Sequence, residues 1–279
     1  MRFILPAIAA LALGAPAQAH DPAASDAVMQ AAINHASRVE DRARDQFRNP
    51  AETLKFFQLE PGMKVGEYGP GGGWYTRILS HYLADRGQYV ALWFNLDDVP
   101  FPDDAKARIG TTAAEFPAAV ANWTGHSADK FKSMTMNNVP ESEKGTFDRI
   151  LLFRTLHGLS NWNMLDSEIK AMHGLLKPGG MIGVVQHRAA EGASDEYSTG
   201  PKGYMSQDHV INMMNFYGFD LVGVSEINAN PKDKANHPAG VWYLPPTNRD
   251  LADGDAVGKA SRDAIGESDR MTLLFRKRS

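Results

Sequence analysis

The sequence has 279 residues and contains no cysteine. This absence excludes disulfide bonds, thiolate zinc sites and cysteine nucleophiles together. A chain without thiols is compatible with an oxidising compartment, where a stray thiol is a liability. Any nucleophile or base in this protein must therefore come from hydroxyl, imidazole, amine or carboxylate side chains.

The sequence also lacks a strong excess of either positive or negative charge. The 33 acidic residues nearly balance the 29 basic ones and leave a formal net charge of -4. Proteins that bind nucleic acid or anionic membranes usually show a clear basic excess. After the N-terminal segment, no run is long and apolar enough to cross a bilayer. We therefore expect no nucleic-acid partner and no membrane span, while the oligomeric state stays open.

The N-terminus has the pattern of a secretory signal peptide. Arg2 supplies the positive end, residues 3–13 form an apolar stretch too short to span a bilayer, and residues 17–19 read A-x-A. The sequence therefore predicts cleavage after Ala19, a mature chain that begins at His20, and a periplasmic location.

The most informative stretch is residues 65–76, where an apolar run leads to Glu67 and then to a glycine-rich turn. A helical pattern follows, so the turn joins a strand to a helix. Glycine permits a sharp turn and the close approach of a ligand, and a helix start offers free N–H groups. A dinucleotide fingerprint fails here, because the third glycine of a G-x-G-x-x-G that starts at Gly69 would fall on Trp74.

Strands and helices alternate along the rest of the chain, which predicts a mostly parallel sheet covered on both faces. After the first strand, further strands are expected at residues 89–94, 131–136, 147–153, 181–186, 219–227 and 271–276. Helices are expected at residues 26–38, 51–57, 163–176 and 207–217, and at 105–123 with an interruption at Pro117. Residues 177–180 are interpreted as a turn, and residues 250–268 as a surface loop with some helix.

Residues 37–50 are dense in charge, which is typical of a solvated helix face. For Arg38, Arg42 and Arg48 we expect surface solvation, although an arginine there would also suit an anionic substrate. The domain organisation predicted is a signal peptide, residues 1–19, and a single domain, residues 20–279, with an N-terminal helical extension over residues 20–57.

The pattern E-x-G-x-G-x-G of residues 67–73 resembles the first motif of class I S-adenosylmethionine (SAM) dependent methyltransferases. Residues 147–150 resemble the start of the fourth strand of that superfamily, and residues 175–180 the turn before its fifth strand. A narrower resemblance, to predicted exported bacterial methyltransferases, rests on longer strings such as residues 184–188, 225–233 and 240–246. The resemblance implies an α/β, Rossmann-like class I methyltransferase fold with a mostly parallel seven-stranded sheet and helices on both faces.

The resemblance also implies SAM as cofactor and a small molecule as substrate. In the superfamily the acidic residue lies near the methionine amino group and the glycines line the cofactor. The cofactor-binding residues expected on this basis are Glu67, Tyr68, Gly69, Pro70, Gly71, Gly73, Asn95 and Asn137.

Two acids usual in the superfamily are missing. The ribose-binding acid at the end of the second strand corresponds to Trp93, so Asn95 or Asp97 would have to substitute. The acid after the third strand is absent too, and residues 135–138 offer hydroxyl and amide groups instead. An amide can still hydrogen-bond a ribose or an adenine edge, without the charge-assisted strength of a carboxylate.

Polar residues follow the fourth and fifth predicted strands, at an edge where parallel strands end together. His157 and His187 are candidate catalytic bases, since the unperturbed pKa of histidine lies near neutrality. The alternative is that each imidazole only satisfies a buried hydrogen bond. Arg154, Arg188 and Asn230 are candidate substrate-binding residues. No metal is expected, because no ligand spacing supports a site built from Glu67 and the two histidines.

Three functions compete. The leading hypothesis is an exported SAM-dependent methyltransferase. The second is an exported ligand-binding protein that kept the fold without transfer activity, which the missing ribose acid and the export signal favour. The third is an exported metal-dependent enzyme, for which the spacing is poor. Fold alone does not choose between them.

Overall fold

The structure is a computed structural model that describes residues 22–278. The predicted signal peptide, residues 1–19, and its cleavage site lie outside the described residues. Within the described range no helix is long and apolar enough to cross a membrane.

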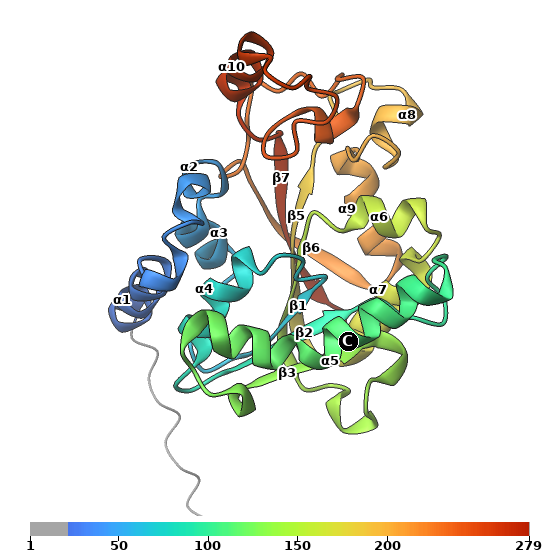
Figure 1. The fold of residues 1–279 in the computed structure, drawn as a ribbon. Coiled ribbons are helices and arrows are strands. Elements are labelled where there is room, and N and C mark those ends of the chain that lie inside the picture. The colour runs from blue at the N-terminus through green and yellow to red at the C-terminus, as the bar shows by residue number, and fades with distance from the viewer. Residues whose placement is uncertain (1–21, 279) are drawn as a thin grey trace, which may run out of the picture.

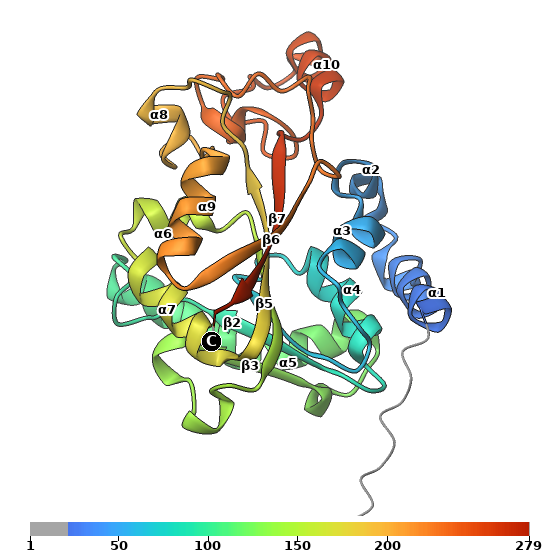
Figure 2. The ribbon, with the colours of Figure 1, turned by 180° about the vertical axis from the view of Figure 1, so that it is seen from behind.

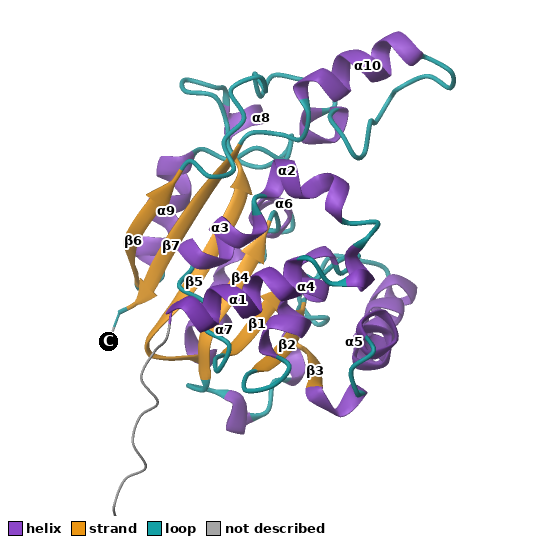
Figure 3. Ribbon diagram, turned by 90° about the vertical axis from the view of Figure 1, so that its left-hand side faces the viewer, coloured by secondary structure: helices purple, strands orange, loops and turns teal. Residues whose placement is uncertain are grey.

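A seven-stranded sheet forms the centre of the described chain, in the order β3-β2-β1-β4-β5-β7-β6 (Figures 1 and 3). The strands are β1 (Lys64–Tyr68), β2 (Gln88–Trp93), β3 (Phe131–Thr135), β4 (Phe147–Phe153), β5 (Leu176–His187), β6 (Phe219–Ser225) and β7 (Arg270–Lys277). The strands β1 to β5 pair in parallel, and β7 runs antiparallel to both β5 and β6. The prediction of a mostly parallel seven-stranded sheet is therefore confirmed.

Helices cover both faces of this sheet, as Figures 1 and 2 show from opposite sides. The α-helices are α1 (Pro22–Ile33), α2 (Asp45–Arg48), α3 (Pro50–Phe56), α4 (Trp74–Leu83), α5 (Asp103–Thr124), α6 (Leu156–Asn161), α7 (Leu165–Leu175), α8 (Asp195–Ser198), α9 (Gln207–Phe216) and α10 (Ala256–Ile265). One core cluster joins α1, α3, α4 and α5 to the sheet, and a second joins α6, α7 and α9. In β4 successive residues alternate between the two clusters, with Leu151 in the first and Leu152 in the second, because neighbouring side chains of a strand point to opposite faces.

Two local expectations were wrong. The helix α5 continues through Pro117, since Phe116 and Val120 are buried in the first core cluster and this packing outweighs the hydrogen bond that proline removes. The short helix α6 was not expected at all. Residues 177–180, expected as a turn, lie within the bounds of β5 but pair with no residue of β4, because the register passes from Leu176–Phe147 directly to Met181–Arg149, and Gly179 has a left-handed φ of 71°.

The charged segment of residues 37–50 is not a solvated face. Arg38 is 0% and Arg48 3% exposed, whereas Arg42 is exposed as expected. The two buried guanidinium groups lie 5.0 and 4.7 Å from the ring centroid of Trp74. Cation–π contacts and ion pairs stabilise these charges away from water, which a count of charged residues does not reveal.

Beyond the carboxyl ends of β4 and β5, the chain between β6 and β7 and the helices α8 and α10 form a cap, seen at the top of Figures 1 and 3. This cap includes the 3-10 helix Gly240–Tyr243. It lies over the edge of the sheet where the candidate site residues gather.

Candidate functional site

The glycine turn between β1 and α4 has a left-handed backbone at alternating positions, with φ of 64° at Gly69, 56° at Gly71 and 78° at Gly73. A Cβ on Gly73 would lie 2.4 Å from the ring of Trp123, so that glycine is required by protein packing. A Cβ on Gly71 would meet only the carbonyl oxygen of Gly69, at 4.0 Å. The turn therefore presents open space at Gly71, where a ligand can approach the backbone.

Glu67 is the penultimate residue of β1 and is 3% exposed. Its Oε2 accepts hydrogen bonds from the hydroxyls of Thr76 and Tyr89, both at 2.7 Å. Burial raises the pKa of Glu67 to about 7, even though the two donors act in the opposite direction. Both donors reach the same oxygen, so the carboxyl group is held in one orientation at the end of the strand.

Two cavities meet at this edge of the sheet. The smaller, of about 210 Å³, lies at the glycine turn and is lined by Glu67, Pro70 and Gly71 among others. The larger, of about 390 Å³, lies at the ends of β4 and β5 and is lined by His157, His187 and Trp242 among others. The residues that line both cavities are Arg44, Arg48, Gly69, Phe153 and Arg154.

Three arginines converge on one carboxylate in the larger cavity. The Nε of Arg44 donates to Glu267 at 2.6 Å, the Nε of Arg48 donates to it at 3.0 Å, and Arg270 forms a further hydrogen bond with it. Burial alone would raise the pKa of Glu267, but Arg270, Arg48 and Arg44 together lower it to about 2. Glu267 is thus ionised and carries the negative charge that holds the three side chains together.

Arg154 adds a fourth guanidinium to the same cavity. It directly follows β4, and its φ of 61° lies in the left-handed region that long side chains rarely adopt. The sheet imposes this conformation, because its backbone N–H donates to the carbonyl oxygen of Val185 at 2.7 Å. Burial and the charges of Arg48 and Arg270 lower the pKa of Arg154. Backbone strain of this kind is concentrated at functional sites.

The structure brings the two candidate histidines together. The ring centroids of His157 and His187 are 5.6 Å apart, and both rings line the larger cavity together with Gly69. Burial lowers the pKa of His157 to about 4 and that of His187 well below its usual value. Both imidazoles are therefore neutral near pH 7.

Their hydrogen bonds distinguish the two rings. The amide nitrogen of Gln186 donates to the carbonyl oxygen of Gly203 at 2.9 Å, which fixes the orientation of this amide. The same nitrogen lies 3.3 Å from Nδ1 of His157, so Nδ1 accepts and the proton of the neutral ring is on Nε2. Nδ1 of His187 lies 2.5 Å from Oγ of Ser268, a hydroxyl that can accept from it or donate to it. In the tautomer that carries its proton on Nδ1, His187 donates to Ser268 and keeps the lone pair of Nε2 for a ligand. His187 is accordingly the better candidate base of the two.

The ends of β2 and β3 have a different character. The side-chain amide of Asn95 donates to Asp98 at 2.8 Å, and that of Asn137 donates to Asp97 at 3.2 Å. Trp93 packs edge-on against Phe116 and donates to Ser133. Neither asparagine lines either of the two cavities described above.

The other predicted residues are held by contacts within the protein. Tyr68 is 0% exposed and packs edge-on against Phe94 in the second core cluster. Arg188 forms ion pairs with Glu226 and Asp269. The side chain of Asn230 donates to two backbone carbonyl oxygens, those of Ile265 and Glu267. These two residues fasten the loop after β6 to the start of β7 and do not line the larger cavity.

Three site residues, Arg44, Glu267 and Arg270, were not expected from the sequence. No local pattern indicates that Glu267 contacts residues more than 200 positions away. In the described chain no group of three or more histidine, aspartate and glutamate side chains is arranged to hold a metal ion.

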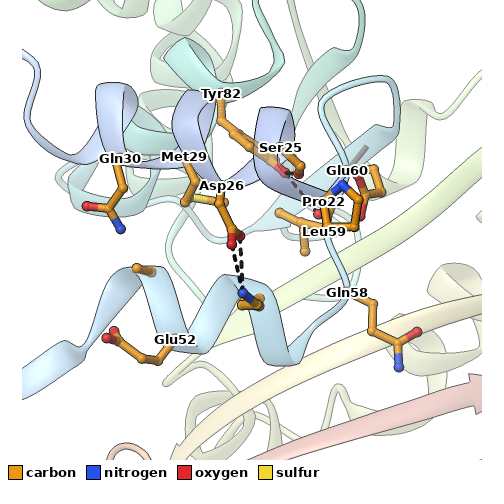
Figure 4. A pocket seen from close by; sticks show the side chains of 12 residues that line it. Pro22, Ser25, Asp26, Met29, Gln30, Glu52, Gln58, Leu59, Glu60 and Tyr82 are labelled. Carbon is orange, nitrogen blue, oxygen red and sulfur yellow. Dashed lines mark hydrogen bonds and ion pairs between the residues drawn. The ribbon is translucent and has the colours of Figure 1, made fainter. Parts of the chain in front are cut away.

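A further cavity, of about 420 Å³, lies between α1 and α3 (Figure 4). Asp26 pairs with Lys55 there, and the hydroxyl of Tyr82 donates to the carbonyl oxygen of Leu59. It is lined by residues of α1, α3 and α4 and of the loop after α3, and by none of the strand-end residues above. We therefore place the candidate site at the two cavities of the sheet edge.

Among solved structures, the chain is similar to a SAM-dependent methyltransferase from Aquifex aeolicus, with a TM-score of 0.50 and 20% identity over 73% of this chain and 93% of that one. It is also similar to 1,6-didemethyltoxoflavin-N1-methyltransferase from Burkholderia thailandensis (TM-score 0.49, 14% identity, 95% and 94% covered). A third is a SAM-dependent methyltransferase from Methanosarcina mazei (TM-score 0.47, 11% identity, 81% and 97% covered). No family model and no curated protein matches the sequence.

The first of these similarities, together with the strand order, shows a Rossmann-like class I methyltransferase fold.

Proposed function

We propose that this protein is a SAM-dependent methyltransferase that acts on a small molecule. The observation that carries the proposal is the glycine turn after β1, which presents open space at Gly71 beside the oriented carboxyl group of Glu67. In open α/β sheets, ligands bind in the crevice outside the carboxyl ends of the strands. The fold and this local geometry agree on the same place.

The residues at the turn suit the methionine part of SAM. Glu67 would bind the amino group, because Oε2 already takes both hydroxyl donors and Oε1 remains for a ligand. The N–H groups at the start of α4 are suited to the carboxylate, as helix N-termini are to anions in general. Asn95 and Asn137 remain our candidates for the ribose and adenine. SAM, when bound, would supply an activated methyl group.

The chain itself would contribute positioning and a base. Holding two reactants in line accounts for a large part of catalysis in such transfers. The free Nε2 of His187 would accept a proton from the acceptor, and the Nε2–H of His157 would donate a hydrogen bond to it. With its lowered pKa, His187 is a weak base, which suits an acceptor whose proton leaves readily.

We further propose that the protein acts in the periplasm after cleavage at Ala19, on the strength of the N-terminal pattern. The competing function is an exported binding protein of the same fold. It is favoured by Trp93, which occupies the place of the ribose-binding acid and is itself packed against Phe116.

Calorimetric titration with S-adenosylhomocysteine, which has the same amino group, tests cofactor binding. Because the amino group pairs only with ionised Glu67, whose pKa is about 7, affinity should rise about tenfold from pH 6 to pH 8 and then level off. In Glu67→Gln the affinity at pH 8 should fall about tenfold, and the rise with pH should disappear. No binding by the wild-type protein at either pH would refute the proposal.

A further inference from the structure

The larger cavity has a strong excess of positive charge. Four arginines line it, namely Arg44, Arg48, Arg154 and Arg270, and the only acidic residue among its lining residues is Glu267. The two histidines of the cavity are neutral near pH 7, because burial lowers the pKa of each. With four cations and one anion, 4 - 1, the lining has a formal charge of +3.

Several of these guanidinium groups have buried nitrogens without a hydrogen-bond partner in the described chain. They are Nη1 of Arg48, Nη1 of Arg154 and Nε of Arg270. Arg48 is 3% and Arg270 2% exposed, so water does not compensate for the missing acceptors. Buried donors of charged groups are costly to leave unpaired, and unpaired ones at a cavity indicate a missing acceptor.

Glu267 does not supply these acceptors. Its two oxygens already take Arg44, Arg48 and Arg270, and Arg154 forms no side-chain hydrogen bond with any described residue. The strained backbone of Arg154 nevertheless holds its side chain at the wall that the two cavities share. The arrangement is that of a preformed anion site with one internal counter-charge.

The wall contributed by residues 241–247 of the cap is mainly apolar. It consists of Val241, Trp242, Pro245 and Pro246 together with the polar Thr247, all from the loop between β6 and β7. Trp242 lies edge-on to His157, with ring centroids 5.8 Å apart, and the guanidinium carbon of Arg249, which does not line the cavity, lies 4.6 Å from the centroid of the Trp242 ring. A ligand that enters the cavity thus meets an aromatic and proline surface on one side and guanidinium groups on the other.

We propose that the larger cavity binds an organic oxyanion, a molecule with a carboxylate or phosphate head on Arg154, Arg48 and Arg270 and an apolar part against Trp242. Planar guanidinium forks match both head groups in geometry and charge. The volume, about 390 Å³, is within the range of small-molecule sites, about 300–1,000 Å³. The inference rests on the proposed function in one respect: the oxyanion is the methyl acceptor.

Calorimetry at constant ionic strength tests the site with four probes: phenyl phosphate, benzoate, inorganic phosphate and the neutral analogue benzamide. At least one of the aromatic anions should bind, and about tenfold or more tighter than benzamide, because charge-assisted hydrogen bonds are lost with the neutral probe. If phenyl phosphate binds more tightly than benzoate, the ligand of the site has a phosphate head group. If benzoate binds more tightly, the ligand has a carboxylate head group. Equal binding of benzamide and both anions, or no binding of either anion, overturns the proposal.

Variants locate the binding. Arg154→Gln should lower the affinity for the preferred anion about tenfold or more. Arg44→Gln, at the half-exposed rim, should lower this affinity less and leave the fold intact. Arg108→Gln removes an exposed arginine of α5 whose one ion pair within residues 22–278 is with Asp104, and it should leave anion affinity unchanged. Trp242→Ala should reduce the affinity for phenyl phosphate toward that for inorganic phosphate. Unchanged affinity in both Arg154→Gln and Arg44→Gln would show that the anion binds elsewhere.

A repeat of the titration on protein saturated with S-adenosylhomocysteine separates this inference from the proposed function. Anion binding should persist, because most of the larger cavity lies outside the glycine turn. Loss of anion binding in the saturated protein would mean that the anion occupied only the shared arginines, which overturns the acceptor site and leaves cofactor binding intact. Anion binding without any binding of S-adenosylhomocysteine would refute the cofactor and leave the oxyanion site standing.

Discussion

The two ends of the sheet edge differ in whether the hydrogen bonds of their polar side chains are satisfied within the protein. After β2 and β3, the amide of Asn95 is satisfied by Asp98, three residues away, and that of Asn137 by Asp97, 40 residues away. At the ends of β4 and β5, buried guanidinium nitrogens of Arg48 from α2, Arg154 after β4 and Arg270 at the start of β7 have no hydrogen-bond partner in the described chain. The first end is complete by itself, whereas the second is complete only with an anion.

The two ends therefore differ in how much binding free energy a ligand can gain there. A self-satisfied surface can still bind a ligand, but each contact must replace one that exists, so the net gain is small. A preorganised and unpaired surface gains the full value of each new hydrogen bond. We therefore expect changes at the arginine end to have large effects and changes at the asparagine end to have small ones.

The largest effect is expected for Glu267→Gln. Removal of the one carboxylate among three arginines should lower the free energy of unfolding at pH 7 by about 3 kcal/mol, because it leaves buried charges unpaired. Urea denaturation measures the loss, and saturating phenyl phosphate should recover part of it. The control is Glu226→Gln, which removes an ion pair with Arg188 on a carboxylate that is 61% exposed, and should cost at most about 1 kcal/mol.

The same two variants should also differ in how their free energy of unfolding changes at acidic pH. Since the pKa of Glu267 is lowered to about 2, its stabilisation is fully present above the unfolded pKa of about 4.5 and is lost as pH falls from there toward 2. This part of the acid dependence should disappear in Glu267→Gln. Equal stability of Glu267→Gln and Glu226→Gln would contradict the view that Glu267 holds the arginine end together.

An intermediate effect is expected for Gly71→Val. A β-branched residue at φ of 56° is strained, and its side chain would fill the open space at the turn, so affinity for S-adenosylhomocysteine should fall about a hundredfold. Gly125→Ala is the matched control, since Gly125 also has a positive φ, of 77°, and also faces open space, but at the end of α5. Calorimetry on both folded variants decides, and an equal loss in both would exclude a role of the turn in binding.

The smallest effect is expected at the other end of the edge. Asn137→Ala should lower the affinity for S-adenosylhomocysteine by no more than about fivefold. The reason is that a contact of Asn137 with the ligand competes with the hydrogen bond that Asn137 already donates to Asp97. Asn95→Ala should behave alike, and neither change should affect the oxyanion probes. A loss as large as that of Gly71→Val would show that the two ends contribute equally, and the comparison would fail.

Local pattern was enough to predict much of the architecture. The alternation of apolar strands with helices predicts the covered parallel sheet, because the periodicities of 2 and 3.6 follow from the backbone alone. The local pattern failed at Pro117, where burial of the helix in the core outweighs what proline favours locally. Part of the site could also be predicted from the sequence, because residues at the carboxyl ends of parallel strands share one edge. This part comprises the glycine turn, Glu67, Arg154, His157 and His187.

The charge of that edge depends on the tertiary structure alone. Arg44 and Arg48 come from the helices before β1, while Glu267 and Arg270 come from the start of β7, more than 200 residues later. Each of these residues alone is typical of a solvated surface, and the sequence indicates nothing else for it. Packing removes water from Arg48, Glu267 and Arg270, with Arg48 lying against Trp74, while Arg44 stays partly exposed at the rim. Burial thus turns an ordinary set of charges into a site with donors still to be satisfied.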